Sequence, residues 1–285
     1  MEWERAKNII LIAFVLLNLG LAGLLFLEDS RYTMGQERVR TINTVLSDNN
    51  IVLYTHLMRR FPPMRHLNIA GFDYDVSALV QIFFDDPNSA IQEEKPDGHY
   101  VFTDGIARLE VLSGFVSFVS FDKEPILGEN VYEIPHAQAI IHSDNFIARN
   151  FPDFVRDIVF DEYGGGGVRV IYRQEYRGRL IYSNNIEFLI SSRGIEWVDM
   201  HFGQVLGYSA ETRRIFAPDE ILLTFMQRMR GDNPIFINAI DMVYMKGYWS
   251  DTPGAVYPAV PVYRIFVRDS DFPIKINAFT NVIFE

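Results

Sequence analysis

The sequence predicts an α+β protein: one N-terminal transmembrane helix, then tandem units that each combine a helix with an antiparallel β-meander. Three observations predict this architecture. The chain begins with a long uncharged apolar stretch, short apolar runs separated by turns ending in Gly recur after it, and helical spacing of apolar residues restarts ahead of such runs. Hydrophobic residues make up 48% of the 285 residues and aromatic residues 14%, which is enough apolar side chain for a core.

The apolar stretch near the N-terminus has the length of a membrane span. Ile9–Leu27 contains no charged residue, and Asn18 is its one strongly polar side chain. As a helix it would extend about 28 Å, close to the thickness of the hydrocarbon layer. A cleaved signal peptide has a shorter apolar core of roughly 7–15 residues and a small-residue cleavage site. Here the stretch runs into Leu-Phe-Leu-Glu-Asp, so we predict an uncleaved anchor over residues 9–27.

The charges that flank the span favour one orientation. Arg5 and Lys7 lie close to its N-terminal end, while Glu28 and Asp29 lie at its C-terminal end. A count of basic residues alone does not decide the orientation of the span, because three arginines also follow it: Arg31, Arg38 and Arg40. Since only residues 1–8 precede the span, the simplest topology has a cytoplasmic tail over 1–8 and an extracytoplasmic region over 28–285.

The net charge of −11 belongs to the outer region, because residues 1–8 are balanced and the span is uncharged. An acidic domain argues against binding to nucleic acid and to anionic lipid headgroups. We interpret the charge as a contribution to solubility. The chain has no cysteine, which excludes disulfides, thiolate metal sites and cysteine nucleophiles.

The first part of the outer region is predicted to begin with a helix. Thr33-Met34-Gly35-Gln36 has the form of a capping box, apolar residues follow at helical spacing, and Asn49-Asn50 ends the pattern. A strand is predicted at Ala78–Phe84 and a long loop at Asp85–Gly98. Turns at Asp104-Gly105 and Ser113-Gly114 then separate three predicted strands: His99–Thr103, Ala107–Leu112 and Phe115–Phe121.

A polar segment around residues 122–133, with Pro125 and Gly128, predicts a boundary between two subdomains, 28–130 and 131–285. A helix is predicted from Pro135, with one apolar face formed by Ala137, Ile140, Ile141 and Ala148. A second helix is predicted from Pro218, where acidic residues complement the helix dipole. The predicted strands of this part are Val168–Tyr176, Arg179–Ile190, Ile195–Leu206, Ile235–Met245, Val260–Arg268 and Ile274–Phe284.

No motif in the chain predicts catalysis or metal binding. His136 and His142 are six residues apart, a spacing that does not align them on one helix face, and no His-Glu-x-x-His occurs. Ser143 lacks the Gly-x-Ser-x-Gly elbow of a hydrolase. Four glycines at 164–167 are followed by Val-Arg instead of Lys-Ser/Thr, which indicates a hairpin tip and not a phosphate loop. We expect no enzyme, no metal and no cofactor.

Asn18 marks a candidate interaction site inside the membrane. An unpaired amide near mid-span is costly, and a hydrogen bond to another helix relieves that cost. Ala22 lies one turn later on the same face, and Phe14, Gly20 and Gly23 are nearby. These residues form a docking face for a partner's transmembrane helix, or they are part of a lone anchor in which the Asn is tolerated.

Several motifs resemble the YycI (WalI) family. They are the opening Met1-Glu2-Trp3-Glu4-Arg5-Ala6-Lys7 with the span containing Phe14 and Leu17-Asn18, then Tyr172-Arg173-Gln174-Glu175-Tyr176-x-Gly178, Ile181-Tyr182-Ser183-Asn184 and Pro261-Val262-Tyr263-Arg264-Ile265. The resemblance covers the anchor and roughly residues 130–285. It implies a membrane-anchored accessory regulator of Gram-positive bacteria, with tandem α+β units and no catalytic residues. It also implies partners: a YycH-like protein and a WalK-like sensor histidine kinase that controls cell-wall metabolism, contacted partly through transmembrane helices.

Two hypotheses of function follow. The first is a non-enzymatic regulator of such a kinase, acting through transmembrane and extracytoplasmic contacts. The alternative is a membrane-anchored extracytoplasmic binding module for a cell-wall or peptide ligand, which predicts a concave pocket with a few convergent polar groups. An anchored hydrolase is disfavoured by the missing motifs.

Overall fold

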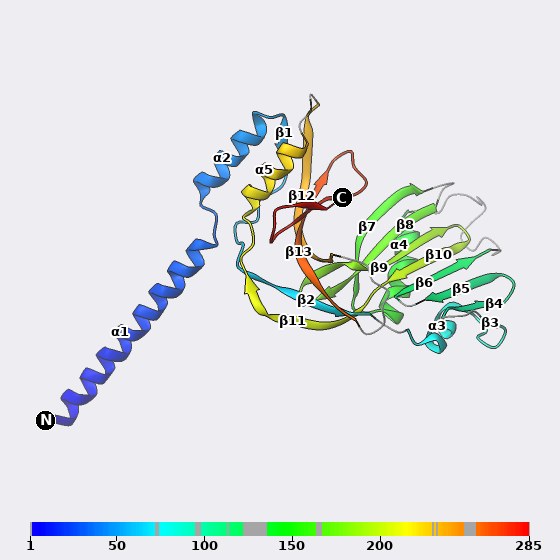
Figure 1. The fold of residues 1–285 in the computed structure, drawn as a ribbon, viewed down its shortest axis with the longest axis horizontal. Coiled ribbons are helices and arrows are strands. Elements are labelled where there is room, and N and C mark those ends of the chain that lie inside the picture. The colour runs from blue at the N-terminus through cyan, green and yellow to red at the C-terminus, as the bar shows by residue number, and fades with distance from the viewer. Residues whose placement is uncertain are drawn as a thin grey trace. The chain divides into compact units, whose positions relative to one another are not determined.

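The computed structural model describes residues 2–71, 74–94, 98–112, 114–121, 136–163, 167–229, 231, 233–247 and 255–284. The predicted fold class is confirmed: an N-terminal apolar helix precedes a largely antiparallel sheet with interspersed helices (Figure 1). The chain forms two compact units, each discontinuous in sequence. The first comprises Met1–Met64, Thr212–Asp241 and Tyr263–Glu285, and the second Arg65–Glu211 and Met242–Val262.

The first unit contains three helices and short strands. Its elements are α1 (Glu2–Arg31), α2 (Gln36–Ser47), β1 (Ile51–Leu53), α5 (Pro218–Arg228), β14 (Ile274–Asn277) and β15 (Ile283–Phe284). Two long strands, β12 (Ile235–Lys246) and β13 (Val256–Val267), contribute residues to both units. β1 pairs in parallel with β12, and β14 and β15 form an antiparallel hairpin.

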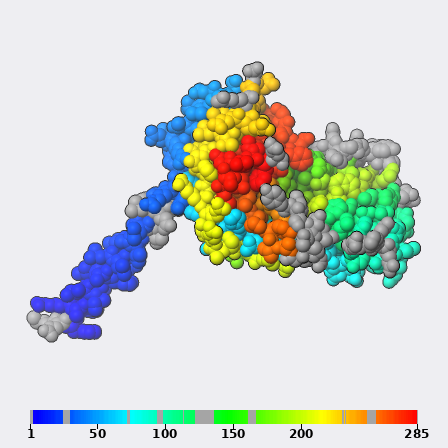
Figure 2. Space-filling model, in the orientation of Figure 1, coloured from blue at the N-terminus to red at the C-terminus, as the bar shows by residue number. Residues whose placement is uncertain are grey.

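Helices α2 and α5 pack against each other in the first unit, and their surfaces adjoin in the space-filling view (Figure 2). Ile42 and Leu46 are the buried side chains of α2, and α2 also contacts β1. The buried stripe of α5 contains Ile221, Leu222 and Phe225, as the spacing predicts. The burial of these three side chains contributes roughly 1.5–3 kcal/mol each.

The second unit is built on an antiparallel sheet in the order β7-β8-β9-β10-β6-β5-β4-β3. A second group of strands, β11-β2-β13-β12, joins this sheet through one parallel bridge between Tyr244 of β12 and Ile181 of β9. The bounds are β2 (Met64–Ala70), α3 (Val76–Phe83), β3 (Ile91–Glu94), β4 (Tyr100–Thr103), β5 (Ala107–Leu112), β6 (Phe115–Ser120), α4 (His136–Asn150), β7 (Phe154–Tyr163), β8 (Gly167–Tyr176), β9 (Arg179–Ser191), β10 (Gly194–His201) and β11 (Gln204–Arg213).

One hydrophobic core lies between this sheet and helices α3 and α4. α4 contacts β7, β8 and β9, and α3 contacts β5. Alternate residues of the strands point into the core, for example Val170 on β8, Phe188 on β9 and Phe118 on β6. Phe83 of α3 stacks on Phe118 with ring centroids 4.8 Å apart. The predicted hairpins of β4, β5 and β6 are confirmed, with antiparallel registers throughout.

The prediction of a strand at Ala78–Phe84 is wrong, because residues 78–83 belong to helix α3 and Phe84 is its C-cap. Asp75 caps the helix: its side chain accepts a hydrogen bond from the Ala78 amide at 3.1 Å. The buried residues Leu79, Val80 and Phe83 follow helical spacing. A short apolar run does not distinguish a buried strand from a buried helix, and here the cap and the contacts with the sheet decide. The loop predicted at Asp85–Gly98 contains a further strand, β3.

Two helices form where predicted but differ in detail. In α2 the N-cap is Gly35 with no side-chain cap, so the predicted capping box at Thr33 is wrong. In α4 the residues buried against the sheet are Ala139, Ser143 and Ile147, whereas Ile141 is 57% exposed. The predicted apolar face of α4 is therefore rotated from the observed one, because the sheet covers the side of the helix that carries Ala139, Ser143 and Ile147.

Two predicted strands are each split in two. The predicted strand Ile195–Leu206 ends at His201, and β11 begins after a turn at Phe202-Gly203; Ile274–Phe284 becomes the hairpin β14–β15. The predicted subdomain boundary at residues 122–133 and the glycines at 164–166 lie outside the described residues, so the division at residue 130 stays a prediction. The second unit described above includes residues from both sides of that position.

Candidate functional site

Helix α1 contains a segment, Trp3–Leu24, that is long and apolar enough to cross a bilayer, with a mean hydropathy of 2.0. Its large apolar side chains are exposed, Phe14 by 65%. A helix that is apolar on all sides and uncovered by its own chain is suited to lipid or to another membrane helix. The candidate residues Phe14, Asn18, Gly20, Ala22 and Gly23 all lie on this helix.

Asn18 uses one of its hydrogen-bonding groups within α1. Its Nδ2 donates to the carbonyl oxygen of Phe14 at 2.7 Å, one turn earlier. This bond lowers the cost of placing the amide in lipid, but an amide side chain has a second N–H and a carbonyl oxygen. Those groups remain available to a second helix. Because Phe14, Asn18 and Ala22 are spaced by four residues, they lie on one side of α1.

The glycines of the candidate set do not belong to that side. At about 100° of rotation per residue, Gly20 and Gly23 lie roughly 140–160° around the helix from Asn18. A Cβ placed on either glycine would meet no atom of the described residues within 4 Å. The helix therefore presents an Asn18 stripe and a separate side with the two glycines.

The segment between α1 and α2 is hydrogen-bonded to the first unit. Thr33 forms an antiparallel β-bridge with Arg60, the Met34 amide donates to the Arg59 carbonyl at 2.8 Å, and the Phe61 amide donates to the Tyr32 carbonyl at 2.9 Å. The Met34 side chain is buried, with 2% exposure. Helix α1 is thus joined to the rest of the first unit by a short paired segment and not by a free linker.

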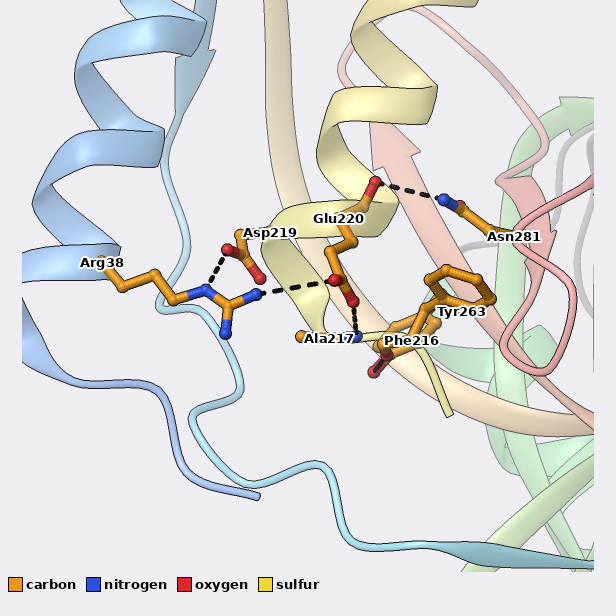
Figure 3. A network of polar contacts seen from close by, with 7 residues as sticks. All are labelled: Arg38, Phe216, Ala217, Asp219, Glu220, Tyr263 and Asn281. Atoms are coloured by element: carbon orange, nitrogen blue, oxygen red, sulfur yellow. Dashed lines mark hydrogen bonds and ion pairs between the residues drawn. The ribbon is translucent and has the colours of Figure 1, made fainter. Parts of the chain in front are cut away.

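A polar network connects α2 to the first turn of α5 (Figure 3). Arg38 of α2 forms an ion pair with Asp219 and lies 3.9 Å from Glu220. Both carboxylates lie at the positive end of the α5 dipole, and Asp219 is 8% exposed. Glu220 Oε2 also accepts from the Ala217 amide at 2.8 Å, which satisfies a donor that the helix leaves open.

The same network continues to the C-terminal strands. Asn281 Nδ2 donates to the Glu220 carbonyl at 3.5 Å, and the Tyr263 hydroxyl donates to the Phe216 carbonyl at 3.0 Å. Sequence reasoning treated Arg38 only as a charge near the membrane. Its partners are 181 and 182 residues away in sequence, so no local pattern indicates the contact.

Two of the motifs that carry the family resemblance, residues 172–178 and 181–184, lie on β8 and β9 of the second unit and are partly buried there. The Tyr172 hydroxyl lies 2.7 Å from Ser143 Oγ and 2.6 Å from Asp144 Oδ1 on α4, and burial raises the pKa of Tyr172. Arg173 is 4% exposed and pairs with Asp157 at 2.8 Å. These side chains stabilise the contact of α4, β7 and β8; they do not form a surface for a partner.

Asn184 and Tyr74 hold the turn between β10 and β11. Asn184 Nδ2 donates to Gln174 Oε1 at 2.7 Å and to the Gly203 carbonyl at 3.0 Å, and its Oδ1 accepts from the Gly203 amide at 3.3 Å. The Tyr74 hydroxyl accepts from the Phe202 amide at 3.3 Å, and burial raises its pKa. The turn is therefore fixed from two sides by buried polar groups.

This turn forms one wall of a groove of about 590 Å³ in the second unit. The groove is lined by three segments: residues 150–154 between α4 and β7, residues 174–177 at the end of β8, and residues 202–205 at the start of β11. It combines aromatic rings with carboxylate and amide side chains. Among the described residues, no group of three His, Asp or Glu side chains is placed to hold a metal ion.

No protein-family model matches the chain, and no curated protein matches it in sequence. Solved structures do match in fold. An uncharacterized protein from Eubacterium rectale ATCC 33656 is similar with a TM-score of 0.54 and 10% sequence identity, over 82% of this chain and 90% of that one. At this identity the similarity shows a shared fold.

Two further solved structures overlap less well. The C-terminal domain of YpeB from Bacillus megaterium is similar with a TM-score of 0.43 and 11% identity, over 76% of this chain and 97% of that one. YycH from Bacillus subtilis is similar with a TM-score of 0.44 and 12% identity, over 77% of this chain and 56% of that one. Similarities of this size do not establish a shared function.

Proposed function

We propose that this protein is a non-enzymatic regulator of a WalK-like, cell-wall-sensing histidine kinase, acting together with a YycH-like partner. In this proposal residues 1–8 are cytoplasmic, α1 crosses the membrane, and the two α+β units lie outside the cell. The observation that carries it is the paired connection between α1 and α2, because a plain tether needs no such connection. The motifs similar to the YycI family support the identity of the partners.

The proposed mechanism is a shift between two states of the kinase. The Asn18 stripe of α1 packs against the kinase transmembrane helices, and the outer units bind the partner protein, the kinase sensor domain, or both. A regulator that binds one of the two states more tightly increases the population of that state. The segment Tyr32–Met34 and the Arg38–Asp219 pair link a change at the outer units to the end of the membrane helix.

The first test is co-purification of the full-length protein from its native membrane in mild detergent, with mass spectrometry of the bound proteins. The proposal expects a histidine kinase and a second single-pass protein of similar size. Recovery of neither, under conditions that preserve other membrane complexes, would contradict the proposal.

The second test moves the amide around the helix. Asn18→Leu is expected to weaken kinase recovery several-fold, because an interhelical hydrogen bond of an amide contributes about 1 kcal/mol. The matched control is the double variant Asn18→Leu with Leu16→Asn, which keeps the composition of the span but rotates the amide by about 160°. It should fail like Asn18→Leu. Equal recovery of the kinase by all three proteins would exclude docking through Asn18.

A second candidate function is a membrane-anchored binding module for a cell-wall or peptide ligand. The observation that favours it is the groove of the second unit, whose volume of about 590 Å³ is within the range of ligand sites. The two functions are compatible, because a ligand bound to the regulator can change which of the two kinase states the regulator binds more tightly.

A further inference from the structure

The walls of the groove are held in place by hydrogen bonds within the protein. Asn184, which is 2% exposed, connects Gln174 in one wall to Gly203 in another, and Tyr74 holds the neighbouring Phe202. Gly203 lies so close to β2 that a Cβ there would be 2.4 Å from the Ala70 carbonyl oxygen. A site whose walls are fixed in this way loses little conformational entropy on binding.

The polar side chains of the groove suit a ligand that both donates and accepts hydrogen bonds. Gln174 and Gln204 offer amides, which have donors and acceptors, and Asp153 and Glu175 offer carboxylate acceptors. Asp153, Glu175 and Gln204 are exposed. Hydroxyl groups also both donate and accept hydrogen bonds. Several of these side chains can therefore each bond one hydroxyl, and no polar group is buried without a hydrogen-bond partner.

Aromatic rings provide the complementary surface. Phe151 and Phe202 line the groove with ring centroids 6.2 Å apart, and Tyr176 lines it from the end of β8. All three are partly exposed. The apolar face of a sugar ring packs on such rings, while the hydroxyls at its edge reach the surrounding amides and carboxylates.

The charges and amides of the groove argue against a polyanion and against a purely apolar ligand. Asp153 and Glu175 repel a polyanion, and the single cation, Arg177, has its guanidinium 5.4 Å from the Tyr176 ring and 5.9 Å from the Tyr208 ring. A purely apolar ligand would leave the amides and carboxylates without partners.

We propose that this groove binds a neutral, hydroxyl-rich oligosaccharide. The proposal rests on the second candidate function, names the ligand class for it, and does not depend on the kinase. The sugar ring stacks against the aromatic rings, and its hydroxyls bond Gln204, Asp153 and Glu175.

The test measures binding of chitotetraose, a neutral oligosaccharide, to the full-length protein by saturation-transfer NMR and calorimetry. The detergent must have no sugar headgroup, because a glycoside detergent would compete. Binding is expected, and the double variant Asp153→Ala/Gln204→Ala should weaken it by about fivefold or more, as the loss of one or two hydrogen bonds does. Gln227→Ala, which removes an exposed amide of α5 outside the groove, is the matched control and should bind normally.

Two results would overturn the proposal. One is the absence of chitotetraose binding, or binding that the double variant leaves unchanged. The other is tighter binding of a cationic tetrapeptide than of chitotetraose at the same groove, which would assign the site to peptides. Kinase co-purification in the same preparations separates the two proposed functions, because a failure of sugar binding leaves the recovery of the kinase unaffected.

Discussion

At the scale of single residues, Gly203 determines how closely β2 and the β10–β11 turn approach. A Cβ at this position would lie 2.4 Å from the Ala70 carbonyl oxygen and 2.6 Å from Ile69 Cγ2. The first of these atoms belongs to the backbone, so it cannot rotate away as a side chain can. The requirement for glycine here comes from packing and not from a left-handed backbone.

We therefore expect Gly203→Ala to lower the free energy of unfolding by roughly 1–3 kcal/mol, the usual cost of overpacking. Thermal or urea unfolding of the full-length protein in detergent measures the change. Gly247→Ala is the control, because a Cβ at Gly247 meets nothing within 4 Å. Equal stability of the two variants would show that β2 and the turn separate without cost.

The Arg38–Asp219 pair gives a second prediction at this scale. Arg38→Ala leaves Asp219, which is 8% exposed, without its cation, so we expect a loss of about 1 kcal/mol. The loss is moderate because the Arg38 side chain is 45% exposed and the pair is partly screened by water. Arg40→Ala removes a neighbouring exposed arginine that forms no ion pair among the described residues, and it should change stability by less than about 0.5 kcal/mol. Urea unfolding of both variants makes the comparison.

At the scale of elements, the connection between α1 and α2 distinguishes the two proposed functions. A regulator needs a paired connection, whereas a tethered binding module does not. Insertion of Gly-Ser-Gly after Arg31 adds flexible chain next to the paired segment Tyr32–Met34. We expect the kinase to co-purify as before while its regulation is lost, measured as kinase autophosphorylation in reconstituted membranes. Unchanged autophosphorylation would mean that α1 only anchors the outer units.

The elements also show which sequence patterns predict structure. Turns ending in Gly predicted the β4–β5–β6 hairpins because a left-handed turn is a local property: Gly105 and Gly114 both have positive φ. The run Ala78–Phe84 was misread because an apolar segment of this length fits a strand or a helix. Its contacts with the sheet, and the cap at Asp75, made it helical.

At the scale of the whole molecule, three buried tyrosines predict how stability depends on pH. Burial raises the pKa of Tyr74, Tyr172 and Tyr244 above the ordinary value of 10.0. In the unfolded chain they ionise near pH 10, while in the folded chain they keep their protons. Stability should therefore be intact below about pH 10 and decline above it, by up to about 1.4 kcal/mol per pH unit for each tyrosine. Absorbance titration should show these tyrosines ionising only together with unfolding, and early ionisation would contradict their burial.

The absence of cysteine allows a direct test of membrane topology. Single-cysteine variants Glu4→Cys and Ser47→Cys place one thiol on each side of the predicted span, at exposed positions. A membrane-impermeant maleimide should label Ser47→Cys in intact cells and Glu4→Cys only after permeabilisation. The wild-type protein gives the background. The opposite pattern would reverse the orientation.

The sequence by itself determined the features that depend on neighbouring residues: the apolar span, the fold class, the hairpins and most helix positions. It also indicated Asn18, because a polar side chain in an apolar run is visible without a structure. It did not indicate the groove, although Gln174 and Asn184 belong to motifs that were noticed. The contact of Asn184 with Gly203, and the contact of Arg38 with Asp219, join segments that are separated in sequence. Only the tertiary structure decided these sites, because the free energy of burying and pairing such side chains depends on partners that chain folding brings together.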